Sequence, residues 1–501
     1  MEWKTYKDSA AAAAAVCDVK SELPVETEIL IPDYLPPVFK VVKCFADLVV
    51  VQAVTTAARL TAEGYLRVSL WYQTEDGQLC TAETKMPFSR QAELPAEGVL
   101  HPDAVVTGET EYINCRAVNE RRLEVRGAFA VYITVYAEEE TEVITALEGD
   151  GVYRRSAEIS CERCAAVSEK LITAEEDVTF DIPPEAVLSI DCAGMVEEAK
   201  LPSGKAVLKG TVYARITYRG ADSGALLSAE KSVPFREILD APGADESCSC
   251  FAVAQPSGAS LAAAADESSY TLSVTASLKA RVYRPVQLTC VTDAFCTTHE
   301  MELTSREVTF EEPEDMFVRQ TEAVASGKLP DASVEIVGAF AQALVPELAE
   351  TETGSCLRGR CLVHILCRNE RGEIDCLDKA CEYTLPLSAA GETQRSVRAW
   401  ACVRSVSARK AGDEASAAVL VEVSARVARR RRMQVLTQAA QGEELRRRTD
   451  AAVVVCYADK GEDVFDVAKH YASSPEAIAA ANDVGEGVLD APARLLIPPQ
   501  A

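Results

Sequence analysis

The residues with the richest chemistry in this sequence are its cysteines. The chain has 501 residues, of which 18 are cysteine and only four are histidine. Cys161 and Cys164 form a CxxC pair, and Cys248 and Cys250 form a CxC pair. A structural zinc site needs a second ligand pair at a set spacing, and none is evident. We therefore expect no bound metal and free thiols in the newly made protein, while later crosslinking in an oxidising assembly stays open.

Several other cysteines lie in or beside strand-like runs, where a reduced cysteine behaves as a small hydrophobe. These are Cys361, Cys367, Cys376 and Cys381. His364 lies in the same region and is expected to be structural, whereas His101 and His299 are expected in loops and His470 on a solvent-facing helix side.

The sequence contains no Ser-His-Asp, Gly-x-Ser-x-Gly, Walker or dinucleotide-binding motif. The chain is therefore predicted to be non-catalytic and to need no cofactor.

The net charge of the chain limits the kinds of partner that we expect, and its apolar runs and first residues indicate where in the cell it works. The formal net charge is −27, from 78 acidic and 51 basic side chains. Such a surface repels phosphate backbones, so nucleic acid is not expected as a partner. No stretch approaches the ~20 apolar residues that a membrane span needs, and the first residues show no export signal. We expect a cytoplasmic protein without membrane insertion.

A basic island interrupts this acidic chain at residues 429–432 and 446–448, which are all arginine. Two interpretations stay open. The arginines could line a solvated strand edge that their charge protects from pairing with another strand. They could also form a docking patch for an acidic partner or for the acidic faces of neighbouring copies.

A threefold internal repeat organises most of the sequence. Turn glycines at 77, 224 and 372 follow strand-like runs that alternate apolar and polar residues, at 66–72, 212–218 and 361–367. A second strand-like motif recurs at 123–129, 272–278 and 420–427. Alternation with period two is typical of half-buried antiparallel strands, and glycine accepts the positive φ of a hairpin turn. The sequence predicts a mainly β protein with three tandem antiparallel β-sandwich-like units, at about 1–150, 151–300 and 301–450.

The last fifty residues, 451–501, have a different texture and predict a small α+β module. A strand is expected at 453–457, followed by a helix with Asp463 as its N-cap. Ser474 and Pro475 open a second helix, which Asn482 ends. A closing strand is expected at 495–498. The predicted order is strand, helix, helix, strand.

The three units resemble the SPOCS domain, which is found in sporulation proteins. The resemblance rests on the hydrophobic register, the turn glycines, the Pro-Phe endings at 87–88 and 234–235, and the Thr-Asp-Ala-Phe sequence at 292–295. The third unit departs from this pattern, because Glu382-Tyr383 replaces Pro-Phe. Its sheet edge is therefore expected to differ.

The C-terminal module resembles a LysM domain. Residues 461–463, Gly-Glu-Asp, stand where a LysM domain has its Gly-Asp-Thr turn, and residues 465–471, Asn482 and 494–498 match its helices and last strand. The resemblance implies binding, usually of N-acetylglucosamine polymers, in a groove between residues 461–465 and 483–491. The candidate binding residues are Gly461, Glu462, Asp463, Val464, Phe465, Asn482 and Leu489. The changed turn and the Asp-Ala-Pro at 490–492 favour a protein partner over glycan. Phe465 could either anchor that partner or pack in the core against Ile478 and Leu495.

Three SPOCS-like units followed by one LysM-like module resemble the SipL-like family of spore-coat morphogenetic proteins. The resemblance implies a scaffold in the mother-cell cytoplasm that collects on the forespore surface and in the spore coat. Its LysM domain is then expected to dock to a coat morphogenetic ATPase. The alternative is a cell-wall protein that binds peptidoglycan or cortex glycan, and the missing export signal favours the scaffold.

Overall fold

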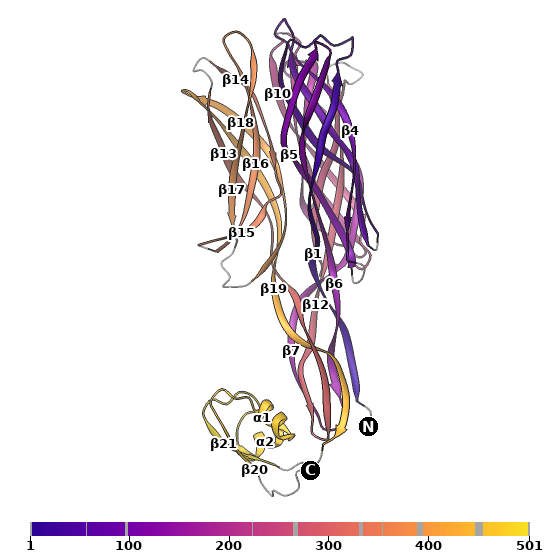
Figure 1. The fold of residues 1–501 in the computed structure, drawn as a ribbon, viewed down its shortest axis with the longest axis vertical. Coiled ribbons are helices and arrows are strands. Elements are labelled where there is room, and N and C mark those ends of the chain that lie inside the picture. Colours follow the sequence, from indigo (N-terminus) through magenta and orange to yellow (C-terminus); the bar gives the residue numbers. More distant parts are fainter. Residues whose placement is uncertain are drawn as a thin grey trace.

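The computed structural model describes the chain except for residues 1–2, 57, 96–98, 223, 264–268, 330–333, 353, 388–393, 446–453 and 499–501. The protein is mainly β, as the alternating sequence pattern predicts, and the described residues include two short helices. The strands fall into three strand groups, followed by a small C-terminal module (Figure 1). No helix among the described residues is long and apolar enough to cross a membrane.

The strand groups share one order of elements. The first group comprises β1 (Lys4–Leu30), β2 (Lys40–Thr56), β3 (Arg59–Gln73), β4 (Leu79–Glu93), β5 (Val99–Asn119) and β6 (Arg122–Glu148). The second comprises β7 (Val152–Val178), β8 (Pro184–Lys200), β9 (Lys205–Gly220), β10 (Leu226–Asp240), β11 (Ser249–Ala263) and β12 (Tyr270–Cys296). The third comprises β13 (His299–Lys328), β14 (Glu335–Ala343), β15 (Glu347–Thr351), β16 (Gly354–Arg368), β17 (Ile374–Pro386), β18 (Arg395–Ala411) and β19 (Glu414–Glu444).

Each group contains two antiparallel sheets around a core of its own. The first group has sheets β1-β6-β5 and β2-β3-β4, and the second has β7-β12-β11 and β8-β9-β10. The third has β13-β19-β18 and a sheet in which β14 and β15 pair with different parts of β16, with β17 on the other side of β16. In the third group, two short strands, β14 and β15, thus take the position that the single strands β2 and β8 have in the other groups.

The three turn glycines lie in hairpins that meet at one place. Gly77, Gly224 and Gly372 have φ values of 78°, 64° and 80° and connect β3 to β4, β9 to β10, and β16 to β17, as expected. The Gln73 side chain donates to the carbonyl oxygens of Gly77 (3.1 Å) and Gly372 (2.9 Å) and accepts from the amide of Ile374 (2.7 Å). The first and third groups are therefore joined through their hairpins.

A glycine faces an aromatic ring across one strand pair in every group. The pairs are Gly64 with Phe88, Gly210 with Phe235, and Gly359 with Tyr383. A Cβ atom on Gly210 would lie 2.1 Å from the carbonyl oxygen of Met195 and 2.5 Å from the Phe235 ring. The glycine leaves the space that the ring fills. Tyr383 therefore keeps the aromatic contact although the third group lacks the Pro-Phe sequence.

The first and last strands of each group form a long two-stranded ribbon that extends beyond the sheets. The ribbons are β1/β6, β7/β12 and β13/β19, and their ends pack together in the narrow lower part of the molecule, here called the stalk (Figure 1). Its core draws on all three ribbons: Ala10 and Val143, Ile159 and Leu288, and Val308, Phe310 and Val435. The three groups therefore share a core in the stalk.

Buried arginines from β18 and β19 join the groups just above the stalk. Arg426 pairs with Glu162 of the second group (2.6 Å) and with Glu311 (3.2 Å), and its guanidinium lies 3.8 Å from the centre of the Tyr283 ring. Arg398 pairs with Asp103 of the first group. Buried charges need such partners, because taking them out of water is costly.

One expectation from the sequence is wrong, and one recurring motif differs in its register. His101 and His299 lie in strands β5 and β13 rather than in loops, and His101 has φ of 50° at a β-bulge. In the second strand motif, Leu123 and Leu272 are buried, but Leu420 is only half-buried between the buried Val419 and Val421. The motif on β19 is therefore shifted by one residue, because such a shift moves every side chain of a strand to the other face of the sheet.

Gly210→Ala should destabilise the protein by about 2 kcal/mol or more, because the added methyl group collides with backbone and with a buried ring. Urea unfolding followed by circular dichroism measures the effect. Gly258→Ala is the matched control, since nothing lies within 4 Å of a Cβ there. Equal unfolding midpoints for the two variants would contradict the proposed role of the glycine–aromatic pair.

Candidate binding face of the C-terminal module

The module consists of β20 (Val454–Ala458), α1 (Val464–Tyr471), α2 (Pro475–Asn482) and β21 (Ala493–Ile497), in the predicted order. Both helices begin where the sequence places them. The Asp463 carboxylate accepts a hydrogen bond from the Phe465 amide (2.9 Å), and the Ser474 hydroxyl accepts one from the Ala477 amide (3.1 Å). These caps satisfy amide groups that the first helical turn leaves unpaired. The predicted start at Val453 lies outside the described residues.

The two loops that were expected to border the binding groove are joined by backbone hydrogen bonds. The Gly461 amide donates to Leu489 (2.9 Å), the Leu489 amide donates to Glu462 (2.8 Å), and the Val464 amide donates to Gly487 (3.1 Å). Gly461 has φ of 95°, which favours glycine. Residues 461–465 and 486–489 therefore form one continuous surface, which together with Asp466 and Lys469 on α1 is here called the binding face.

Three of the candidate residues contribute to the module's own structure. Val464 and Leu489 are buried in its core. The Asn482 side chain donates to Ile478 (2.7 Å) and to the Leu496 carbonyl (2.8 Å) and accepts from the Leu496 amide (2.7 Å). Asn482 thus ties the end of α2 to β21. Gly461 and Glu462 are exposed, and Asp463 is partly exposed.

Part of the binding face lies against the second ribbon. Arg155 on β7 forms ion pairs with Asp463 (2.8 Å) and Asp466 (3.1 Å). Its guanidinium stands 4.5 Å from the centre of the Phe465 ring, within the range of a cation–π interaction. Burial opposes the charge of Arg155, but the neighbouring carboxylates of Asp466 and Asp463 outweigh it and raise the Arg155 pKa.

Phe465 is buried, with 8% of its surface exposed, and it packs in a cluster that spans the module and the ribbon. Its ring meets Phe295 at 5.1 Å edge to face, and Phe295 stacks on Tyr153 at 5.3 Å. Lys469 on α1 adds an ion pair to Asp293 (2.6 Å). Phe465 therefore belongs to a core that includes Ile478 and Leu495, as one of the two interpretations held, and also contacts the ribbon.

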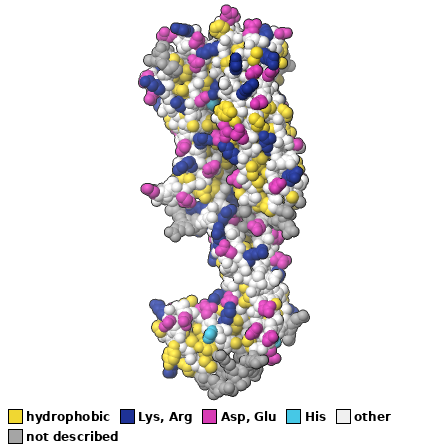
Figure 2. Space-filling model, in the orientation of Figure 1, with side chains coloured by type: hydrophobic (Ala, Val, Ile, Leu, Met, Phe, Trp, Pro, Cys, Tyr) yellow, Lys and Arg dark blue, Asp and Glu magenta, His cyan; other side chains and the backbone are white. Residues whose placement is uncertain are grey.

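Two residues of the ribbon that make this contact lie in a short motif of the sequence. Asp293 and Phe295 belong to the Thr-Asp-Ala-Phe sequence at 292–295. Figure 2 shows the module and the lower end of the stalk as one continuous surface. The paired strands β20 and β21 expose three further hydrophobic side chains, since Val455, Tyr457 and Leu496 are 44%, 80% and 42% exposed.

Part of the second strand group matches a known protein family. Residues 183–260 match the family model described as SipL, SPOCS domain. The match covers β8, β9, β10 and most of β11 of the second group, and it indicates a role in sporulation or the spore coat. No curated protein and no solved structure matches the chain.

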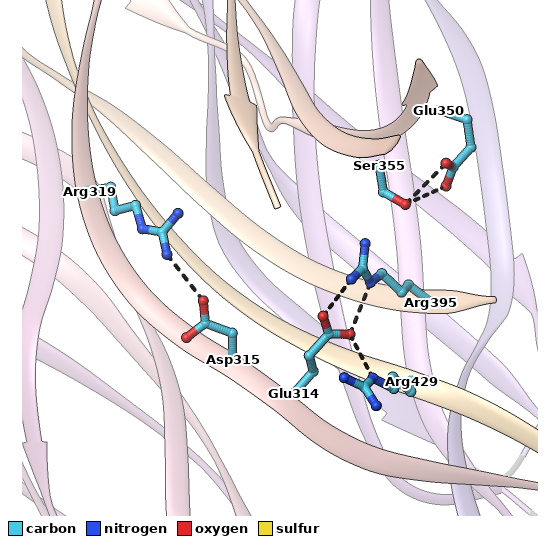
Figure 3. A network of polar contacts seen from close by, with 7 residues as sticks. All are labelled: Glu314, Asp315, Arg319, Glu350, Ser355, Arg395 and Arg429. Atoms are coloured by element: carbon cyan, nitrogen blue, oxygen red, sulfur yellow. Dashed lines mark hydrogen bonds and ion pairs between the residues drawn. The ribbon is translucent and has the colours of Figure 1, made fainter. Parts of the chain in front are cut away.

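The basic island lies outside the SPOCS match and is paired within the chain. Arg429, Arg430, Arg431 and Arg432 on β19 each lie within ion-pair distance of a glutamate on β13. Glu314 bridges Arg429 and the buried Arg395 (Figure 3). Along residues 429–432, β19 pairs with β13 on one side, while its ladder with β18 ends at Arg429. A charged strand edge on the other side and a docking patch both stay predictions. Residues 446–448 lie outside the described residues.

One group of side chains in the described residues has donors suited to a metal ion. His364, Cys376 and Asp378 place a nitrogen, a sulfur and an oxygen within 4.8 Å of one another on β16 and β17. The sequence did not single out this trio, although His364 and Asp378 are direct cross-strand partners. The Lys43 ammonium is paired with Asp378 and competes for the carboxylate. Burial and the Asp378 charge raise the pKa of the Cys376 thiol, which disfavours the thiolate that metals require.

A large cleft of about 1580 Å³ runs between the three groups. Its walls carry opposite charges in pairs, such as Glu109 with Arg360 and Arg215 with Glu230. Burial, reinforced by the nearby charge of Asp47, raises the pKa of Asp191 to about 6. The paired charges give the cleft no strong preference for an anion or a cation.

Asn482→Ala should loosen the attachment of β21 to α2, because the backbone groups of Leu496 exchange a protein partner for water at a net cost of about 0.5–1.5 kcal/mol per hydrogen bond. Hydrogen exchange of residues 493–497, measured by mass spectrometry on the whole chain, should become faster. Glu486→Ala, a change at an exposed loop residue, should leave the exchange as it was. Unchanged exchange in the Asn482 variant would contradict this role.

Incubation with zinc followed by desalting should leave substoichiometric metal by elemental analysis, because Lys43 holds Asp378 and only three donors converge. Lys43→Ala tests the reason, since zinc uptake should rise if the ammonium is the competitor. Stoichiometric zinc on the unaltered protein would refute the prediction.

Proposed function

We propose that this protein is a non-catalytic scaffold of spore-coat assembly. The observation that carries the proposal is the SipL SPOCS match over the second strand group. The first and third groups repeat the strand order of the matched group, with two sheets around one core. On this proposal the three groups are SPOCS-like repeats, with boundaries near residues 150, 300 and 450, and they form a rigid body in the mother-cell cytoplasm.

The C-terminal module is, in this proposal, a LysM-like adaptor that docks the scaffold to a coat morphogenetic ATPase on the forespore surface. The order of its elements, its two helix caps and the joined loops support this assignment. The binding face carries Glu462, Asp463 and Asp466, and this acidic character favours a protein with basic side chains over a neutral glycan.

Glu462→Lys tests the adaptor role. Glu462 is exposed and lies beside the contact with the ribbon, so the substitution reverses one charge of the binding face and leaves the Asp463 cap in place. Binding of the purified coat ATPase to the whole chain, measured by biolayer interferometry, should weaken about fivefold, the usual scale for a rim charge.

Glu175→Lys on the second group is the matched control, because it makes the same charge change at an exposed residue far along the chain from the module. Equal affinities for the two variants would place the ATPase contact elsewhere. Calorimetric titration with hexa-N-acetylchitohexaose distinguishes the proposed adaptor from the alternative, a protein that binds glycan. Saturable binding that Glu462→Lys alters would favour a glycan-binding protein.

A further inference from the structure

The second ribbon ends in four side chains that meet the module, here called the ribbon end: Tyr153, Arg155, Asp293 and Phe295. We infer that the ribbon end is an internal docking site for the binding face and that it competes with the external partner for that face. The inference rests on the proposed function for the existence of that partner. The docking itself depends only on contacts within this chain.

The ribbon end is arranged as one surface. Asp293 pairs with Arg155 across the ladder, and Phe295 pairs with Tyr153. Residues two apart on a strand face the same side, so the four side chains lie together on one face of the ribbon. This face carries one positive charge, one negative charge and two aromatic rings.

The binding face complements that surface in both charge signs. Arg155 meets the acidic pair Asp463 and Asp466, while Asp293 meets Lys469, which lies further along α1. Two contacts of opposite sign allow one orientation and disfavour the reversed one, in which like charges would meet. The contact is therefore oriented, unlike a nonspecific collision between acidic surfaces.

An apolar centre lies between the two charged contacts. Phe465 packs against Phe295, and Tyr153 and Phe295 belong to the same cluster as the module's core residues Val464 and Leu495. Buried aromatic residues ringed by polar contacts are typical of the central part of a stable interface. Because Phe465 is largely buried there, an external partner reaches this residue only when the module leaves the ribbon.

Among the described ribbon ends, this set of side chains occurs in the second ribbon alone. The first ribbon ends in Lys4 and Tyr6 on β1 opposite Glu148 and Ala146 on β6, and the third ends in His299 and Met301 on β13 opposite Glu444 and Gln441 on β19. Neither of these described ends has an arginine or a pair of facing aromatic rings, and the glutamates would repel an acidic module. The contact therefore uses a feature that distinguishes one repeat from the other two.

The competition has a defined effect on affinity. A partner that binds only the undocked module sees an affinity reduced by the fraction of chains in which the module is free. Three partly exposed ion pairs, a cation–π contact and the packing of Phe465 on Phe295 are enough to hold most modules docked. Breaking the contact should therefore strengthen partner binding rather than weaken it.

A zero-length carbodiimide crosslink between Lys469 and Asp293 tests the docking in the whole chain without any partner. The two groups lie 2.6 Å apart, so the unaltered protein should yield this link in its monomer band, identified by mass spectrometry. Arg155→Glu should reduce the yield about tenfold, because it replaces attraction to Asp463 and Asp466 by repulsion. Arg155→Glu with Asp466→Arg should restore it.

Arg494→Glu is the matched control, since it makes the same charge change at an exposed module residue on β21, and the yield should not change. Arg155→Ala serves as a second, milder variant if Arg155→Glu does not fold by circular dichroism. A missing Lys469–Asp293 link in the unaltered monomer, or a yield that Arg155→Glu and Arg155→Ala leave unchanged, would overturn the docking.

The competition is tested with the purified coat ATPase as probe. Arg155→Glu should bind it several-fold more tightly than the unaltered chain does, and Arg494→Glu should not. Equal binding together with a reduced crosslink would overturn the competition. If the ATPase binds neither protein, the proposed partner is wrong, while the crosslink result still decides whether the module docks.

Discussion

Two buried arginines of the third strand group hold the molecule together at the point where the body narrows into the stalk. Arg426 is bound by carboxylates of the second and third groups, and Arg398 by Asp103 of the first group and the Tyr283 hydroxyl of the second (3.3 Å). Burial alone would raise the pKa of Asp103, but Arg398 outweighs it and lowers that pKa. Removing one partner of such a buried pair typically costs about 3–5 kcal/mol, because the other charge is left without compensation.

The rest of the architecture depends on this junction. Each group has its own core, so the groups could in principle stand apart. The arginines fix them side by side, and the ribbons below them then share the core of the stalk. At the opposite end of the body, the first and third groups are joined by Gln73 and by an aromatic cluster that includes Trp71 and Phe340.

The features that the sequence predicted are those that local chemistry determines. The turn glycines, the two helix caps and the mainly β character follow from side chains acting within a few residues of their position. The register of the third group was missed, because Val419, Leu420 and Val421 are all apolar and the alternation does not show which face is buried. Arginines 429–432 looked free because their glutamate partners lie more than a hundred positions earlier in the sequence. The contact of Arg155 with Asp463 was unpredictable for the same reason, although both residues are visible in the sequence.

The long ribbons have a mechanical consequence. β1 begins and β19 ends at the same end of the stalk, and the first residues of β13 pair with the last residues of β19 (Figure 1). A force that separates these strand ends would open the ribbons one hydrogen-bonded pair at a time, like a zipper. A force along the long axis, applied between the stalk and the hairpins that join β3 to β4 and β9 to β10, would instead stretch many ladder hydrogen bonds at once. A molecule of this shape resists tension along its length and yields when its stalk is pried apart.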